Sequence, residues 1–347
     1  MNPEIQPRMT DLSDIYRGRT VTITGGLGFI GSNLAHRLID LDARVRIVDA
    51  LLPACGGNLF NIHSIRDKVD LHIADVGDAE RIDRLVQGSD FIFNLAGHVS
   101  HTNSLADPHL DLHLNCHCSL ALLEACRRHN PSVAVLFAGT RGQYGRAAAL
   151  PVFESHPLNP IDVNGVNKLA AEMYHLLYHR LYGLRTCSLR LTNTFGPRHL
   201  MRRNHQGFLN WFIRLAMDDQ AIPVYGEGAQ LRDFNYVDDV VEAMLLALAS
   251  ESAFGHAFNL GGDSPLSVVD SALAVVRACG TGGIQHIPFP RQERTIEVGD
   301  YWADSSAFRS LTGWRPALTF DEGLRRTVAF YRQHRQHYWD LQHDPVV

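Results

Sequence analysis

Residues 20–31 read T-V-T-I-T-G-G-L-G-F-I-G, and this stretch decides the fold. Its first five residues are a short β-branched run typical of a buried strand. Gly25, Gly28 and Gly31 follow, and the next residues, S-N-L-A-H-R-L-I-D-L, have the apolar spacing of a helix. Such glycines permit a tight turn and let the backbone approach a pyrophosphate, while the helix N-terminus supplies N–H donors. The stretch therefore predicts a dinucleotide-binding strand, turn and helix.

A second apolar run, V-R-I-V, ends in Asp49, about twenty residues beyond the glycines. A carboxylate there would accept both ribose hydroxyls and repel a 2′-phosphate, so we expect NAD rather than NADP. Further short strands are predicted at 70–73, 91–95, 133–137 and 186–191, with helices between them. This alternation predicts an α/β fold with a Rossmann-type, doubly wound parallel sheet.

Composition limits the class of protein. The 347 residues are 45% hydrophobic and 20% charged, which is ample for either one large α/β domain or a domain with a smaller lobe. The formal net charge of −5 gives no indication of a nucleic-acid or acidic-membrane partner. The N-terminus has no apolar signal segment, and no apolar run is long enough to span a bilayer. The six cysteines are scattered, so we expect a reduced, cytoplasmic protein.

A metal site is the less favoured interpretation of C-H-C at 116–118 with His113. The surrounding stretch, D-L-H-L-N-C-H-C-S-L-A-L-L-E-A-C-R-R, has the spacing of an amphipathic helix, on which adjacent residues point apart. The nineteen histidines form no H-E-x-x-H pattern. We therefore expect no metal.

Several further motifs together resemble one family from about residue 19 to 332. The chain is similar to extended short-chain dehydrogenases/reductases, in the NAD-dependent nucleotide-sugar epimerase/dehydratase family (4-epimerase-like). The motifs are T-G-G-L-G-F-I-G (24–31), A-D-V (74–76), N-L-A-G (94–97), T-R-G-Q-Y-G (140–145), K-L-A-A-E (168–172), L-R-L-T-N-T-F-G-P (189–197) and R-D-F-N-Y-V-D-D-V (232–240).

The resemblance implies a role for each matching residue. Those expected to bind NAD are Gly25, Gly28, Phe29, Ile30, Gly31, Asp49, Asp75, Val76, Leu95, Ala96, Gly97 and Lys168. Thr140 would hydrogen-bond the reacting sugar oxygen, and Lys168 the nicotinamide ribose. The residues expected to bind a nucleotide-diphosphate sugar are Asn193 and Arg232 at the phosphates and Val224 and Tyr225 near the base.

The resemblance also implies an organisation. The NAD-binding Rossmann domain would comprise 19–194 with returning segments at about 232–262. A smaller C-terminal α/β substrate lobe would take about 195–231 and 263–335. Residues 1–18 would be an N-terminal extension and 336–347 a tail. The family usually dimerises through two helices, matched here by 112–129 and 165–182, so a homodimer is expected.

The first departure from the family pattern is Asn164, in P-I-D-V-N-G-V-N-K-L (160–169). The family has a tyrosine four residues before the lysine, one helical turn away, as its acid/base. An amide cannot exchange a proton usefully near neutral pH. Three explanations stay open. In the first, another base acts, with Tyr144, a histidine or bound water as candidates. In the second, Asn164 only orients the substrate in slow or different chemistry. In the third, the chain binds NAD and sugar nucleotide without turnover.

The second departure is Arg141-Gly142 after Thr140. The family's 4,6-dehydratases have Asp-Glu there, and its glucuronate decarboxylases typically Ser-Glu. Elimination needs an acid and a base, so the missing carboxylates favour 4-epimerisation over dehydration. Arg141 would alternatively pair with a carboxylate on the substrate, or be a structural residue.

The third departure is Glu297, where related 4-epimerases usually have an arginine on the nucleotide's phosphates. Arg294 is the candidate substitute. The sequence thus predicts a nucleotide-sugar epimerase with a non-standard acid/base. The alternatives are a decarboxylase or dehydratase variant, and a silent NAD and nucleotide-sugar binder.

Overall fold

The main body of the molecule is a parallel sheet of seven strands. The computed structural model describes residues 11–339, apart from 54, 100, 203–206, 291–293, 295 and 296. The strand order is β11-β6-β5-β4-β1-β2-β3, and every neighbouring pair is parallel. The strands are β1 (Thr20–Thr24), β2 (Arg44–Asp49), β3 (Val69–Ile73), β4 (Phe91–Asn94), β5 (Ala134–Thr140), β6 (Arg185–Leu191) and β11 (Ala257–Leu260). The order reverses between β1 and β4, which confirms the predicted doubly wound sheet.

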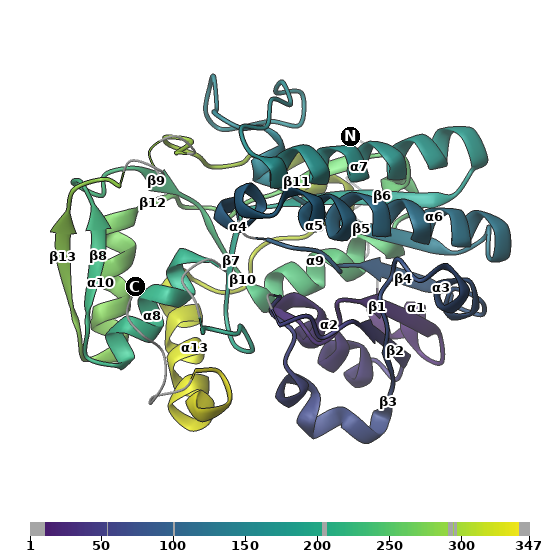
Figure 1. Cartoon of the computed structure of the whole chain (residues 1–347), viewed down its shortest axis with the longest axis horizontal. Coiled ribbons are helices and arrows are strands. Elements are labelled where there is room, and N and C mark those ends of the chain that lie inside the picture. The colour runs from purple at the N-terminus through teal and green to yellow at the C-terminus, as the bar shows by residue number, and fades with distance from the viewer. Residues whose placement is uncertain are drawn as a thin grey trace, which may run out of the picture.

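Helices cover both faces of this sheet (Figure 1). On one face α1 (Leu12–Tyr16), α2 (Phe29–Asp40) and α9 (Val237–Ala249) bury an apolar core against the strands. On the other, α3 (Ala79–Leu85), α6 (Cys118–His129) and α7 (Val163–Tyr182) bury a second core. Because both faces are covered, strands such as β4 are buried throughout rather than alternating.

A smaller lobe lies beside the sheet. Its strands β8 (Ala221–Tyr225) and β13 (Gly283–Ile287) pair in parallel. Its helices α8 (Phe208–Met217), α10 (Val268–Cys279) and α13 (Phe320–His334) share a separate core. Short pairs run between the two parts, namely β7 (Asn193–Phe195) with β10 (Phe234–Tyr236) and β9 (Leu231–Arg232) with β12 (Leu266–Ser267).

The remaining helical elements are short. They are α4 (His101–Ala106), α5 (Pro108–Leu112), α12 (Ser306–Thr312), η1 (Leu59–Lys68), η2 (His113–His117), η3 (Arg141–Gln143), η5 (Glu251–Ala253) and η6 (Arg335–His337). Of these, η2 is a single π-helical turn between α5 and α6.

Three segments pack differently from the expected organisation. Tyr16, in the expected N-terminal extension, is fully buried and its hydroxyl donates to the Leu245 carbonyl at 2.8 Å. Phe308 and Trp314 join the core of the large sheet instead of the smaller lobe. Tyr338 and Trp339, in the expected tail, are buried among the aromatic rings of the smaller lobe. Burial of these large apolar side chains outweighs their position near the chain ends.

No helix in the described part of the chain is both long and apolar enough to cross a bilayer. All six cysteines are free thiols.

Candidate active site

The glycine-rich turn has the geometry that the sequence predicts. Gly25 has φ +69°, and a Cβ there would lie 2.9 Å from the backbone of Ala96. A Cβ at Gly31 would lie 2.4 Å from the Gly25 carbonyl oxygen. The turn therefore tolerates no side chain at either position. It leads into α2, whose N-cap is Gly28, so free N–H groups of a 12-residue helix face the turn.

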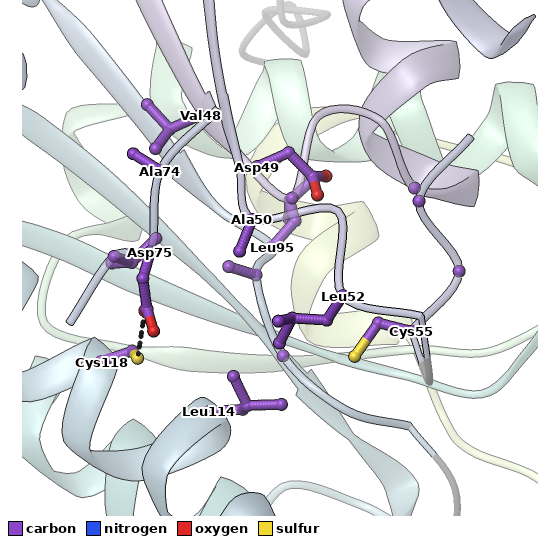
Figure 2. Close-up of a pocket in the computed structure, with 17 residues that line it drawn as sticks. Val48, Asp49, Ala50, Leu52, Cys55, Ala74, Asp75, Leu95, Leu114 and Cys118 are labelled. Carbon is purple, nitrogen blue, oxygen red and sulfur yellow. Dashed lines mark hydrogen bonds between the residues drawn. The ribbon is translucent and has the colours of Figure 1, made fainter. Parts of the chain in front are cut away.

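A pocket opens at the carboxyl ends of β1, β2, β3 and β4 (Figure 2). Asp49 lines it, and its carboxylate accepts from the backbone N–H of Leu27 at 3.0 Å and of Leu51 at 2.9 Å. Burial raises the pKa of Asp49, although these two bonds oppose the shift. The lining residues are Gly25, Gly28, Val48, Asp49, Ala50, Leu52, Cys55, Gly56, Gly57, Ala74, Asp75, Val76, Leu95, Ala96, Gly97, Leu114 and Cys118.

Most predicted cofactor residues meet in this pocket. A glycine cradle, an acid at the end of β2 and a second acid after β3 together fit a dinucleotide. Phe29 and Ile30 begin α2 and do not line the pocket. Sequence reasoning missed residues 50, 52 and 55–57 of the loop after β2, together with Leu114 and Cys118. The loop is signalled only by P-A-C-G-G, and the other two residues come from a distant helix.

Lys168 lies on α7, beside residues 95–97, which follow β4 and line the cofactor pocket; this segment is called the cofactor loop below. The side chain of Lys168 is buried, its Nζ donates to the Ala138 carbonyl at 3.2 Å, and it lies 5.0 Å from the Phe137 ring centre. A Cβ on Gly97 would lie 3.2 Å from this Nζ, so lysine and loop are in contact. Burial lowers the pKa of Lys168 to about 8, against the opposing attraction of Asp111.

Asn164 is turned into a buried polar cluster. Its Nδ2 donates to the His98 carbonyl at 2.6 Å and to Asp111 Oδ2 at 3.1 Å, which uses both amide hydrogens. Asn167 Nδ2 donates to Asp111 Oδ1 at 2.8 Å, and His98 Nδ1 lies 3.4 Å from Asp111 Oδ2. Burial alone would raise the pKa of Asp111, but bonds from His98, Asn167, Asn164 and Asn115 hold it below its usual value.

The hydroxyl group of Tyr144 is hydrogen-bonded to Asn259 and Arg190. The residue is fully buried, its hydroxyl donates to Asn259 Oδ1 at 2.7 Å, and it accepts from Arg190 Nη1 at 2.5 Å. Burial raises the pKa of its phenol. The raised pKa and two buried partners hold the proton on the Tyr144 oxygen, which disfavours Tyr144 among the candidate replacement bases.

Thr140 ends β5 and caps η3, where its Oγ1 accepts from the Gly142 N–H at 3.2 Å. Arg141 follows it. The Arg141 guanidinium lies 5.5 Å from the Tyr301 ring centre, and the structure records no hydrogen bond or ion pair for it among the described residues. Burial lowers its pKa, with Arg232 adding to the shift.

Asp233 lies close enough to Arg141 to interact with it electrostatically. Its Oδ2 accepts from the Ala303 N–H at 3.1 Å, whereas its Oδ1 is buried with no partner in the described part of the chain. Burial raises the pKa of Asp233 to about 7, and Arg141 acts in the opposite direction. Asp233 belongs to the R-D-F-N-Y-V-D-D-V motif, but nothing in that motif indicates a buried carboxyl group beside Arg141.

The positive charge of Arg232 is balanced by an ion pair within the protein. Its Nη2 donates to Glu297 Oε1 at 2.5 Å, and its Nη1 donates to the carbonyl of Gly299. Glu297 thus does more than replace the family's arginine, because it forms an ion pair with the other arginine expected at the phosphates. Arg294 is exposed.

The other expected substrate residues are spread around the junction of the two parts. Asn193 Nδ2 donates to the Asp233 carbonyl at 2.9 Å. Val224 is fully buried in the core of the smaller lobe. Tyr225 packs its ring 5.2 Å from that of Phe289.

These features define a class: a Rossmann protein that binds a nicotinamide dinucleotide, with a buried lysine beside the cofactor loop. The chain belongs to the NAD dependent epimerase/dehydratase family, whose sequence model matches residues 21–261. NAD is accordingly its cofactor.

Epimerases and dehydratases are both similar to this chain along nearly their whole length. A UDP-glucose 4-epimerase of Mycolicibacterium smegmatis is 30% identical over 320 residues, covering 90% of this chain and 99% of the relative. A dTDP-glucose 4,6-dehydratase of Xanthomonas campestris is 29% identical over 333 residues, covering 90% and 93%. The solved UDP-glucose 4-epimerase of Thermotoga maritima with UDP-glucose has a TM-score of 0.83 at 28% identity, covering 91% and 99%.

Proposed function

We propose that this chain epimerises the sugar of a nucleotide-diphosphate sugar at C4, using NAD. The observation that carries the choice is Arg141-Gly142, which stands where elimination would need two carboxyl groups. In the structure this position carries a guanidinium against Tyr301. UDP-glucose, bound in the Thermotoga maritima structure, is the first substrate to try.

The cluster beside Asn164 supports a replacement acid/base. Asp111 Oδ2 lies 3.4 Å from His98 Nδ1, and a carboxylate at that nitrogen favours the tautomer with its proton on Nδ1. The other nitrogen, Nε2, then has the lone pair of a general base. The His98 carbonyl accepts from Asn164, so this residue borders the place of the missing tyrosine. His98 is therefore our proposed acid/base, and Asp111 the residue that positions it.

Each residue of the site then has a task. NAD, when bound, supplies the acceptor and donor of hydride. Thr140 would orient the C4 hydroxyl group, and His98 would take the proton of that hydroxyl and return it to the C4 oxygen when the ketone is reduced on its other face. The Lys168 ammonium group would hold the nicotinamide ribose. Glycine backbone N–H groups at the start of α2 would bind the cofactor's pyrophosphate.

Two observations support other functions. The Arg141 guanidinium has no hydrogen bond or ion pair among the described residues, which favours a carboxylate-bearing sugar and with it a decarboxylase variant. Asn164 donates both of its amide hydrogens to groups of the protein, which favours a protein that binds NAD and nucleotide sugar without turnover.

The test is turnover of a panel of uridine-, guanosine-, cytidine- and thymidine-diphosphate sugars, uronates included. Products are separated by chromatography, and reduced nicotinamide is followed by absorbance. A C4 epimer supports the proposal. Release of CO₂ points to the decarboxylase, a 4-keto-6-deoxy product to a dehydratase, and binding without product to the silent binder.

The base is tested in any active pair by His98→Gln, with His156→Gln as the matched control. We expect at least a 100-fold loss of kcat for His98→Gln alone, together with loss of the acidic limb of the pH profile. Adding Asn164→Tyr should restore part of the rate. An unchanged pH profile in His98→Gln would overturn this assignment.

The proposed assembly is a homodimer in the cytoplasm. Val166, Met173, Leu181 and Tyr182 on α7 leave 51–61% of their surface exposed, and Leu112 on α5 leaves 47%. A band of this kind on neighbouring helices is typical of a subunit interface. Free cysteines suit a reducing compartment.

A further inference from the structure

Three potential metal ligands converge at one end of the cofactor pocket, and Asp75 lies beside two of them. His113 Nε2 lies 3.2 Å from Asp75 Oδ2 and 3.7 Å from Cys118 Sγ, and Cys118 Sγ lies 3.5 Å from Asp75 Oδ1. The ligand atoms of His113, His117 and Cys118 all lie within 4.8 Å of one another. Figure 2 shows the Cys118 side chain pointing at the Asp75 carboxylate at the edge of the pocket.

A local change of helix type brings these residues together. In an α-helix, residue i+5 lies about 140° around the axis from residue i, so His113 and Cys118 would point apart. The turn His113–His117 is π-helical, and the Cys118 N–H donates to the His113 carbonyl. A π-turn places residues i+4 and i+5 on either side of residue i. Both His117 and Cys118 therefore lie over His113, and the two imidazole rings stack 5.1 Å apart.

The donor set selects a kind of metal. Two imidazoles, one thiolate and one carboxylate suit a tetrahedral Zn²⁺ ion, whereas Mg²⁺ and Ca²⁺ prefer oxygen ligands. Neighbouring ligands of one tetrahedral ion lie about 3–4 Å apart, as the donor atoms of Asp75, His113 and Cys118 do here. Cys118 is buried, His113 is half-buried and His117 is exposed, which leaves an entry path from solvent.

We propose that Asp75, His113, His117 and Cys118 form a Zn²⁺ site whose occupation competes with NAD. Asp75 and Cys118 both line the cofactor pocket. Asp75 is also the residue expected to contact adenine, so its carboxylate cannot serve a metal ion and the cofactor equally well. The inference depends on the cofactor site and not on the reaction proposed above.

The Cys118 thiol donates a hydrogen bond to Asp75 Oδ1 at 3.5 Å, which holds its sulfur at this end of the pocket.

Binding is tested with Co²⁺ as the probe on the purified full chain, because a cobalt–thiolate bond absorbs in the near ultraviolet. Cys118→Ser should remove this band, and His117→Ala should weaken binding at least 10-fold. Cys116→Ser is the matched control, since Cys116 lies two residues away and outside the cluster. Absence of a cobalt–thiolate band in the wild-type protein, or equal loss in both cysteine variants, would overturn the site.

Competition is tested by titrating NAD with and without Zn²⁺. We expect Zn²⁺ to raise the apparent Kd for NAD at least 10-fold in the wild-type protein and to have no effect in His117→Ala. Binding of Zn²⁺ that leaves NAD affinity unchanged would refute the competition. Neither readout requires turnover, so failure of the epimerase proposal leaves both results interpretable.

Discussion

Replacing Lys168 with methionine should make the protein more stable while weakening its hold on NAD. Burial lowers the pKa of Lys168 from 10.5 to about 8. Each pKa unit corresponds to about 1.4 kcal/mol, so the buried ammonium group costs the folded state about 3 kcal/mol at neutral pH. Methionine fills a similar volume without charge. After loss of the bond to the Ala138 carbonyl, worth about 1 kcal/mol, a net gain of about 2 kcal/mol remains.

The pH dependence gives the sign of this effect. Below pH 8 the lysine is protonated in both the folded and unfolded states, and the full penalty applies. As pH rises from about 8 to 10.5, the folded state loses its proton first, so wild-type stability rises. Above 10.5 the amine is neutral in both states, and the advantage of methionine disappears.

The assay is the melting temperature of cofactor-free protein at pH 7 and pH 10.5, with Lys68→Met as the control at an exposed lysine. Lys168→Met should melt several degrees higher than wild type at pH 7 and at nearly the same temperature at pH 10.5. Added NAD should stabilise Lys168→Met less than wild type. A lower melting temperature at pH 7, or a difference independent of pH, would refute the reasoning.

Three other substitutions test the packing. Arg190→Leu leaves the Glu172 carboxylate buried without its ion pair and should cost about 3–5 kcal/mol in urea unfolding; a cost below 1 kcal/mol would contradict this. Tyr144→Phe should cost about 1–2 kcal/mol and leave the pH profile of turnover unchanged, whereas a shifted profile would return Tyr144 to the chemistry. Met173→Asp should shift the chain towards monomer in light scattering; Leu273→Asp on α10 is the control, and equal behaviour of the two would argue against an interface on α7.

The sequence was most informative where local chemistry decides structure. The predicted strand 20–24 is β1, and the strands predicted at 70–73 and 91–95 differ from β3 and β4 by one residue each. Such strands are short apolar runs between turn residues, so their positions follow from the chain itself. Gly25 needs a positive φ and Gly31 a close backbone contact, so the cofactor turn could also be recognised from residue types alone.

The parts that escaped prediction depend on contacts between distant residues. Asp111 looks like an ordinary helix residue until α5 packs beside α7 and places it against Asn164, 53 residues away. Glu297 looks like the loss of a phosphate ligand until it pairs with Arg232. The π-turn at 113–117 escaped because periodicity assigns the whole segment to one α-helix.

The position of β11 in the sheet has a consequence for synthesis on the ribosome. This strand pairs with β6, yet about 65 residues separate them in the chain, including the segment that begins the smaller lobe. Until residue 260 emerges, one side of β6 is an unpaired edge of a strand that is buried in the finished protein, which invites strand addition from another molecule. Slow translation beyond residue 191 should therefore lengthen the exposure of that edge, and the yield of folded protein would depend on chaperones that bind nascent chains.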